Sequence, residues 1–348
     1  MRKQTKKIRV GNVEIGGGAP ISIQTMTNTN TEDVKSTLDL IRRSAEAGCD
    51  IIRVSCPSKE ATSALREIIK NSTIAVIADI HFNYKRAIEA IENGADCVRV
   101  NPGNIGDFGM SEIVKAAKNA GIPIRIGINS GSLEKEILDK HKEPTVDALV
   151  ESAFLNCRKL EDLDFREFKV SVKSSNVTTC ISAYRKLSEL INYPLHVGIT
   201  EAGPLFSGTI KSAIGIGSLL ADGIGDTIRV SLSSDPVEEV RVGRQILKSL
   251  GLLKNSVDII SCPTCARTLI DVIGISEHLE HSFGDLQMPV KISVLGCVVN
   301  GPGEARESDI GVFGFQKGIA KIYLKGEEYI TCNENEIINV VEKLITNL

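Results

Sequence analysis

The chain has 348 residues, 42% of them hydrophobic, and a formal net charge of −3 at pH 7. This length suits a barrel of roughly 250 residues with a second module of about 100. The mildly acidic balance argues against a nucleic-acid partner, which favours basic proteins. No stretch approaches the ~18 apolar residues that span a bilayer, and the basic N-terminus lacks the apolar run of a signal peptide. We therefore expect a cytoplasmic protein with neither a membrane nor a nucleic-acid partner.

From Pro20 onward, eight short runs rich in β-forming residues alternate with segments of helical periodicity, which often end at glycine. Eight consecutive β–α units predict an α/β fold: a (β/α)8 TIM barrel over residues 1–253, followed by a smaller α+β domain over residues 254–348. A doubly wound sheet is the alternative, but no GxGxxG turn supports it. The predicted strands are 20–26, 50–56, 73–80, 97–102, 123–129, 168–174, 194–200 and 226–232.

Four of these strands carry an arginine near the carboxyl end. Alternate residues of a strand share a face, and the outward face of a barrel strand must be apolar to pack against helices. The arginines therefore face inward, near the mouth where active sites of this fold lie. Such cations repel one another unless an anion binds, and guanidinium groups match phosphate oxygens. We infer a diphosphate-like substrate, although any one arginine could instead pair with a helix acid. The four arginines are Arg53, Arg99, Arg125 and Arg229.

Other polar side chains at or beyond the strand ends complete the candidate substrate site. Asp79 and Glu201 are the clear acids at matching positions. A carboxyl group at Glu201 could donate a proton to a leaving oxygen, and an ion pair with one of the arginines is its alternative and compatible role. The remaining candidates for substrate binding are His81, Asn101, Asn129, Lys173, Ser175, His196, Thr200 and Ser231.

The nine cysteines fall into two groups. A disulfide framework is not expected in a cytoplasmic chain of this length. Five cysteines sit singly in apolar or helical surroundings, and we interpret them as core residues: Cys49, Cys56, Cys97, Cys157 and Cys180. The other four lie in the last quarter of the chain.

Cys262 and Cys265 form a CxxC at a predicted strand–helix turn, where helix amides would stabilise thiolates. A redox-active disulfide is possible there, but Cys297 in the similar context GCVVNGPG argues for a metal. Zinc usually takes a fourth Cys or His, often in a second close pair. A [4Fe–4S] cluster normally takes four cysteines, so three leave one iron open or held by an unusual ligand. Glu304, in the same loop as Cys297, and Cys332 are the candidates.

The chain closely resembles the bacterial 4-hydroxy-3-methylbut-2-enyl diphosphate synthases of the methylerythritol phosphate route to isoprenoids. The resemblance covers nearly the whole chain, and its motifs are specific in combination. They are SIQTMTNT, ADIHFN, VRVNPGNIG, GINSGSL, VSVKSSN, HVGITEAG, GDTIRVSLS, SCPTC and GCVVNGPGEA.

The resemblance implies an iron–sulfur oxidoreductase acting on CH or CH2 groups. Such enzymes open 2-C-methyl-D-erythritol 2,4-cyclodiphosphate and remove a hydroxyl group as water, using two electrons from ferredoxin or flavodoxin. By position, Glu201 would be the acid and the arginines and lysine of the mouth would hold the diphosphate. The ligands of the [4Fe–4S] cluster would be Cys262, Cys265, Cys297 and Glu304.

The topology also predicts an assembly. The helix after each barrel strand returns to the N-terminal face, so the chain leaves the barrel after Gly251 on the side opposite the arginines. We expect a head-to-tail homodimer in which each cluster domain caps the partner's barrel. Two other functions stay open: a non-redox transferase that binds a pterin or phosphate ligand and has a zinc-stapled appendage, and an iron–sulfur sensor.

Overall fold

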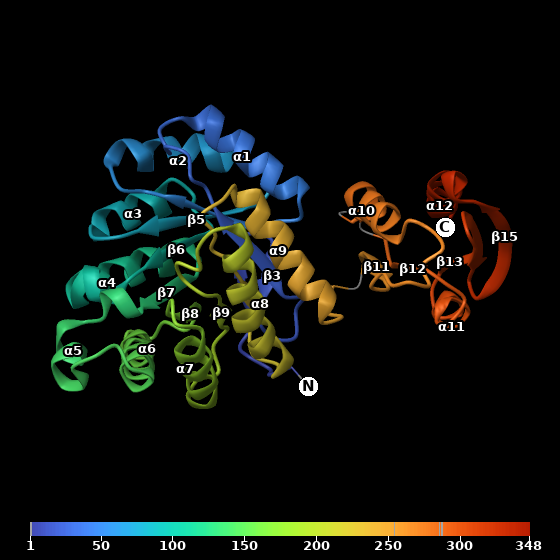
Figure 1. The fold of residues 1–348 in the computed structure, drawn as a ribbon. Helices are drawn as coiled ribbons and strands as arrows, with labels where there is room; N and C mark the ends of the chain where they lie inside the picture. The colour runs from blue at the N-terminus through green and yellow to red at the C-terminus, as the bar shows by residue number, and fades with distance from the viewer. Residues whose placement is uncertain (1, 254, 285, 287) are drawn as a thin grey trace. The chain divides into compact units, whose positions relative to one another are not determined.

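Eight parallel strands form a barrel in the order β8-β7-β6-β5-β4-β3-β10-β9. A bridge between Val170 and Leu195 joins β8 to the segment leading into β9 and completes the ring. This confirms the predicted (β/α)8 fold (Figure 1). The strands are β3 (Ser22–Met26), β4 (Ile51–Ser55), β5 (Ala75–Ile80), β6 (Cys97–Val100), β7 (Ile124–Asn129), β8 (Phe168–Lys173), β9 (His196–Val197) and β10 (Thr227–Ile228).

The computed structural model describes residues 2–253, 255–284, 286 and 288–348. The chain divides into two compact units, Met1–Leu252 and Leu253–Leu348. None of the described helices is long and apolar enough to cross a membrane.

Helices follow the strands and surround the barrel (Figure 1). Several of these helices are preceded by a polar side chain that accepts a hydrogen bond from a backbone amide of the first turn. Asp33 does so for α1 and Asn176 for α7. The β7–α6 connection adds the short helix α5 (Lys135–His141). The other helices are α1 (Val34–Glu46), α2 (Lys59–Asn71), α3 (Tyr84–Glu92), α4 (Pro102–Ala120), α6 (Val146–Asp162), α7 (Val177–Leu190), α8 (Leu205–Ala221) and α9 (Pro236–Ser249).

All eight predicted runs are longer than the strands that form, six of them by one or two residues. The run 97–102 ends as a strand at Val100, because Asn101 caps α4 and Pro102 begins that helix. Proline has no amide hydrogen for a strand ladder but fits the first turn of a helix. In the runs 194–200 and 226–232 only two residues each form a strand, β9 and β10.

An antiparallel hairpin that the sequence did not predict precedes the barrel. It consists of β1 (Ile8–Val10) and β2 (Val13–Ile15). Its apolar side chains pack against inward-facing residues from the N-terminal halves of three barrel strands. The hairpin therefore fills the lower part of the lumen on that side. The cluster contains Ile8, Val10, Ile15, Ile51, Ala75, Ile77 and Cys97.

The second unit has a five-stranded sheet in the order β11-β12-β13-β14-β15. The first three strands are parallel and the last two antiparallel. Helices α10 (Val272–Phe283) and α12 (Ile337–Thr346) pack on one face, and α11 (Gly301–Arg306) packs on the other. The strands are β11 (Val257–Ser261), β12 (Val290–Leu295), β13 (Ile310–Gln316), β14 (Ile319–Leu324) and β15 (Glu327–Asn333).

Two expectations for this unit were wrong. Helix α10 begins at Val272, after its cap Asp271, so the CxxC is not at its first turn. The expected support from helix amides is therefore absent. Glu304 lies on a short helix, α11, rather than in a loop. Strand β15 was not predicted, and α12 begins at Ile337 after a single 3-10 turn.

Candidate active site and cluster-binding site

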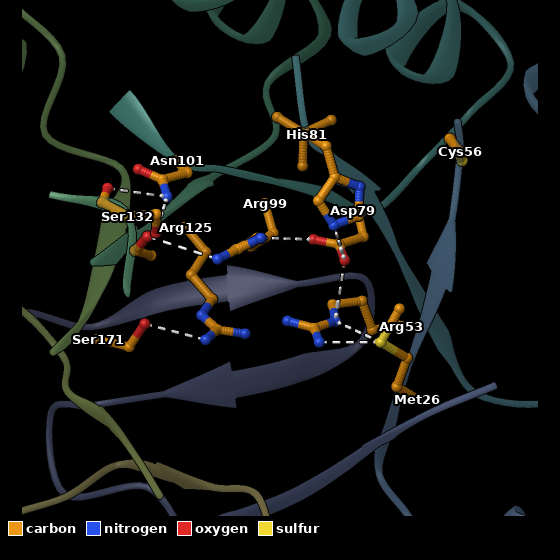
Figure 2. A network of polar contacts seen from close by, with 12 residues as sticks. Met26, Arg53, Cys56, Asp79, His81, Arg99, Asn101, Arg125, Ser132 and Ser171 are labelled. Carbon is orange, nitrogen blue, oxygen red and sulfur yellow. Dashed lines mark hydrogen bonds and ion pairs between the residues drawn. The ribbon is translucent and has the colours of Figure 1, made fainter. Parts of the chain in front are cut away.

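Asp79 is the centre of a network of buried charges inside the barrel (Figure 2). Its Oδ1 lies 3.2 Å from Nη1 of Arg99, and its Oδ2 lies 3.7 Å from Nε of Arg53 and 3.6 Å from Nε2 of His81. Burial alone raises the pKa of a carboxyl group, but the charges of Arg53 and Arg99 outweigh it and lower the pKa of Asp79 to about 2. Asp79 is therefore ionised at neutral pH and shared by two arginines.

The position of Arg99 depends on two residues of the neighbouring strand β7. Its Nη2 donates to the carbonyl of Gly127 at 3.4 Å. A Cβ atom at position 127 would lie 2.5 Å from Nε of Arg99, so only glycine leaves room for the guanidinium group. With its amide oriented to satisfy both of its atoms, Asn129 accepts a hydrogen bond from Nη2 of Arg99 at 3.1 Å. Asn129 thus lies in the predicted cluster.

The other predicted arginines also face the lumen or its rim. Arg125 is 2% exposed and donates from Nη2 to Ser171 Oγ at 2.9 Å. Arg53 donates from Nη2 to the sulfur of Met26 at 2.9 Å. Figure 2 shows the side chains of Arg53, Arg99 and Arg125 pointing into the same space. The inward direction predicted from strand alternation is therefore correct for these three residues.

Arg229 has a partner that the sequence analysis missed. Its Nε lies 3.5 Å from Oε2 of Glu239, a buried residue in the first turn of α9. Glu239 also accepts from Thr25 Oγ1 at 2.6 Å and from the amide of Leu232 at 2.9 Å. Asp79 and Glu201 are thus not the only acids near the mouth, and for Arg229 the alternative of an ion pair with a helix acid is correct.

Lys173 lies at the end of β8 and is 4% exposed. A Cβ atom at Gly198 would approach its Nζ to 2.8 Å, so this glycine also makes room for a cation. Burial, followed by repulsion from Arg125 and Arg229, lowers the pKa of Lys173 well below its usual value. The repulsion among these side chains is the electrostatic signature of a site that an anion would relieve.

The remaining predicted residues are placed less uniformly. Asn101 caps α4 and donates to Ser132 Oγ at 2.7 Å, so both atoms of its side-chain amide already form hydrogen bonds within the protein. His196 is completely buried in the lumen, and Ser175 is exposed on the loop after β8. Thr200 and Ser231 are half-buried beyond the ends of β9 and β10.

Glu201 lies four residues beyond the end of β9 and adopts a φ of 51°. This left-handed conformation is uncommon for residues other than glycine, and such strain occurs preferentially at functional sites. Its side chain is exposed, and the described part of the chain offers it no ion-pair partner. The predicted pairing with an arginine is therefore not seen, and the carboxyl group is available to a ligand.

The candidate cluster ligands lie at the carboxyl ends of two neighbouring parallel strands. Cys262 follows β11, and Cys297 lies two residues beyond β12. The amide of Gly296 donates to Sγ of Cys262 at 3.1 Å, and Cys265 is exposed. Cys332 instead packs in the core between the sheet and α12, and the five predicted core cysteines are all buried.

This donor set suits an iron–sulfur cluster. All nine cysteines are free thiols, and the three beside the strand ends are at least partly accessible. An amide hydrogen bond to a ligating sulfur is one of the means by which proteins tune such clusters. Among the described residues, no three His, Cys, Asp or Glu side chains converge at metal-binding distance. In this structure the four candidate ligands therefore do not meet at one point: Cys262, Cys265, Cys297 and Glu304.

Comparisons with known proteins match both units. The model of the GcpE TIM-barrel domain matches residues 5–244, and that of the GcpE protein C-terminal domain matches residues 258–347. A protein of Caldanaerobacter subterraneus subsp. tengcongensis is 54% identical over 99% of this chain and 98% of its own length. A protein of Clostridium perfringens is 52% identical over 100% of this chain and 99% of its own length. Both are called 4-hydroxy-3-methylbut-2-en-1-yl diphosphate synthase (flavodoxin).

Among solved structures, the barrel resembles dihydropteroate synthases. The enzyme from Stenotrophomonas maltophilia aligns with a TM-score of 0.52 and 10% identity, over 71% of this chain and 98% of that one. At this identity the similarity supports the barrel fold and nothing further about the reaction.

Proposed function

Because the chain belongs to the GcpE family, we infer that it is an oxidoreductase that forms 4-hydroxy-3-methylbut-2-en-1-yl diphosphate in the methylerythritol phosphate route to isoprenoids. The substrate is 2-C-methyl-D-erythritol 2,4-cyclodiphosphate. The observation that carries this proposal is the excess of buried cations in the barrel. Arg53, Arg99, Arg125 and Lys173 face a space in which Asp79 is shared by two of them.

The diphosphate compensates these charges. Guanidinium groups bind phosphate oxygens through paired hydrogen bonds, and a partly desolvated site strengthens each of these contacts. The absence of a Cβ atom at Gly127 and Gly198 leaves room for the guanidinium group of Arg99 and the ammonium group of Lys173, which are proposed to bind the phosphates. His81, which is close to Asp79 and partly exposed, lies at the solvent side of the same network.

Glu201 is the proton donor in this proposal. Removal of a hydroxyl group as water requires a proton at the leaving oxygen, and a positioned carboxyl group can supply it. The strained backbone at Glu201 fixes the direction of this side chain at the end of β9. Thr200 and Ser231, beside it at the strand ends, are proposed to contact the substrate together with Asn129, Ser175 and His196.

Cys262, Cys265, Cys297 and Glu304 are proposed to hold a [4Fe–4S] cluster. When bound, it supplies two electrons one at a time and a Lewis-acidic iron. Because the names of the relatives include flavodoxin, it is the first electron donor to test with this chain, and ferredoxin is the second. Cys332 is excluded from the proposed set because it packs in the domain core.

We further propose a head-to-tail homodimer in which each cluster domain serves the partner's barrel. Helix α9 follows the last barrel strand and returns toward the N-terminal face, whereas the arginines lie toward the carboxyl ends of the strands. A two-fold axis would then supply each barrel with a cluster domain.

The experiment that tests the function is anaerobic. The protein is reconstituted with iron and sulfide, and oxidation of reduced methyl viologen is followed after addition of the cyclodiphosphate. We expect substrate-dependent oxidation and the linear diphosphate as product. A full cluster without turnover would overturn the substrate assignment and leave the sensor interpretation.

A further inference from the structure

The lower half of the barrel lumen is unusually polar on one side. Barrel interiors are normally filled by branched apolar side chains. Here Gln24, Lys169 and His196 are at most 1% exposed, and Arg125 is 2% exposed. The amide atoms of Gln24, both ring nitrogens of His196, Nζ of Lys169, and Nε and Nη1 of Arg125 have no hydrogen-bond partner among the described residues.

Strand register directs these four side chains into one space. Arg125 and Lys169 are direct partners on β7 and β8, and Lys169 shares its face with Ser171, which binds Arg125. His196 is the partner of Thr227, whose hydroxyl binds that of Ser22. Gln24 lies between Ser22 and Met26 on the inward face of β3.

This space lies beneath the mouth and shares Arg125 and His196 with the proposed substrate site. Lys169 lies four residues before Lys173 on β8, which corresponds to about 13 Å along the strand. The apolar hairpin of β1 and β2 packs against the facing half of the lumen floor. Long side chains at the mouth and apolar side chains below therefore enclose the four polar groups.

The charges in this space are not balanced. Arg125 and Lys169 lie side by side, and like charges directly opposite each other destabilise a sheet. The carboxylate of Asp79 is shared by Arg53 and Arg99. Asp226, below Lys169, binds Arg2 through Oδ1 and the amide of Leu195 through Oδ2. No described carboxylate forms an ion pair with Arg125 or Lys169.

His196 fits the same conclusion. Burial, followed by the charges of Arg125, Lys173 and Lys169, keeps the pKa of this imidazole well below its usual value. A neutral imidazole has one N–H to donate, and the amide of Gln24 has two more. All four side chains therefore offer hydrogen-bond donors to the same space, and two of them also offer positive charge.

We propose that Arg125, Lys169, His196 and Gln24 bind one small monovalent anion, of the size of chloride, in the floor of the barrel beneath the diphosphate site. Such an anion would accept the unused donors and separate the two cations. Polar groups buried without partners are rare in proteins, and uncompensated buried charges are more costly still. Because Arg125 and His196 also belong to the proposed substrate site, the anion is proposed for the chain without substrate, and its binding requires neither turnover nor the cluster.

The direct test is crystallographic. Crystals of the reconstituted protein are grown without substrate, in bromide as the only halide, and anomalous scattering is measured at the bromine edge. We expect a peak within hydrogen-bond distance of Lys169 Nζ and an Arg125 nitrogen. Density for water alone at this place, with bromide in excess, would overturn the proposal.

A solution test uses two matched variants. Bromide is titrated against gluconate at constant ionic strength while thermal unfolding is followed. The parent chain should show a saturable rise in Tm of roughly 2–4 °C. Lys169→Met should abolish the rise, whereas Lys173→Met, which removes a buried lysine four residues further along β8, should retain it. Equal responses of the parent and Lys169→Met would refute the site, and the crystallographic result stands even if a variant fails to fold.

Discussion

Nε of Arg229 lies 3.5 Å from Oε2 of Glu239, so a residue of helix α9 neutralises an arginine of the barrel rim. Glu239 also accepts hydrogen bonds from Thr25 and Leu232. One carboxylate therefore connects β3, the segment after β10 and α9. This arrangement holds the start of α9 against the rim and fixes the direction of Arg229.

The change Glu239→Gln removes the charge and keeps the shape. We expect it to lower the free energy of unfolding by about 1–3 kcal/mol, because a buried charged hydrogen bond is lost. Urea denaturation measures the effect. Glu238→Gln is the matched control, since the exposed pair of Glu238 with Arg241 should contribute less than about 1 kcal/mol. Equal effects of the two changes would contradict the role assigned to Glu239.

Asp79 should stabilise the fold in a pH-dependent way. Its pKa is about 2 in the folded chain and 3.8 in the reference state. A lowered pKa gives stability that is present above about pH 4 and is lost as the pH falls towards 2. The shift corresponds to roughly 2–3 kcal/mol. Asp79→Asn should remove this acid-dependent contribution, as measured by unfolding at pH 2.5 to 6.

Asp107→Asn is the control for that experiment. Asp107 is 79% exposed and pairs with Lys159 on the surface. It should leave the acid limb of the stability curve unchanged. If Asp79→Asn also left the acid part of the stability curve unchanged, the Asp79 carboxylate would not stabilise the fold through Arg53 and Arg99.

Lys169 should oppose folding below about pH 8. Burial is the main cause that lowers its pKa to about 8, with Cys97 acting in the opposite direction and Arg125 in the same one. Between pH 8 and 10.5 the folded chain has released this proton and the unfolded chain still binds it, so stability rises with pH. In halide-free buffer, Lys169→Met should remove this rise, which is on the order of 3 kcal/mol.

The measurement is the difference in unfolding free energy between the parent and the variant across that range. Taking the difference cancels the titration of other lysines and tyrosines. If the difference in unfolding free energy does not change with pH, burial does not lower the pKa of Lys169 in the folded chain.

Iron content distinguishes the proposed ligands from Cys332. Cys265→Ser should lose most of the iron bound after reconstitution, because a thiolate ligand is replaced by a hydroxyl group. Cys332→Ala should retain it, since this thiol packs in the domain core. Iron and sulfide are measured per chain together with the absorption near 400 nm. Loss of iron in Cys332→Ala with an intact fold would replace Glu304 as the proposed fourth ligand.

The proposed dimer can be tested by complementation. An Arg99→Ala chain lacks an arginine of the barrel, and a Cys265→Ser chain lacks a cluster ligand. If each cluster serves the partner's barrel, a mixed dimer contains one complete pair, and up to half of the activity per dimer should return. Absence of recovery in dimers verified to be mixed would contradict the exchange.

Much of this protein follows from local patterns in its sequence. Eight β–α units predict the barrel, and the apolar outer face of Ile52 and Val54 forces Arg53 inward. The same alternation holds for Arg99 and Arg125, and the cysteine contexts single out Cys262, Cys265 and Cys297. The barrel and the inward direction of these arginines are predictable because strand period and helix packing depend on residues that are neighbours in the chain, whereas the cluster ligands stay a prediction.

The tertiary structure alone decided which distant groups meet. It paired Arg229 with Glu239 and assigned Asn101 to a helix cap. It also placed Lys169 and His196 together in the lumen, where their side-chain nitrogens have no hydrogen-bond partner among the described residues. The alternation in FKVSVKS directs Lys169 inward with Lys173, but it does not reveal whether an acid lies opposite. That depends on strand register around the closed barrel and on helices that contribute side chains over its rim, so the balance of charge appears only when the ring closes.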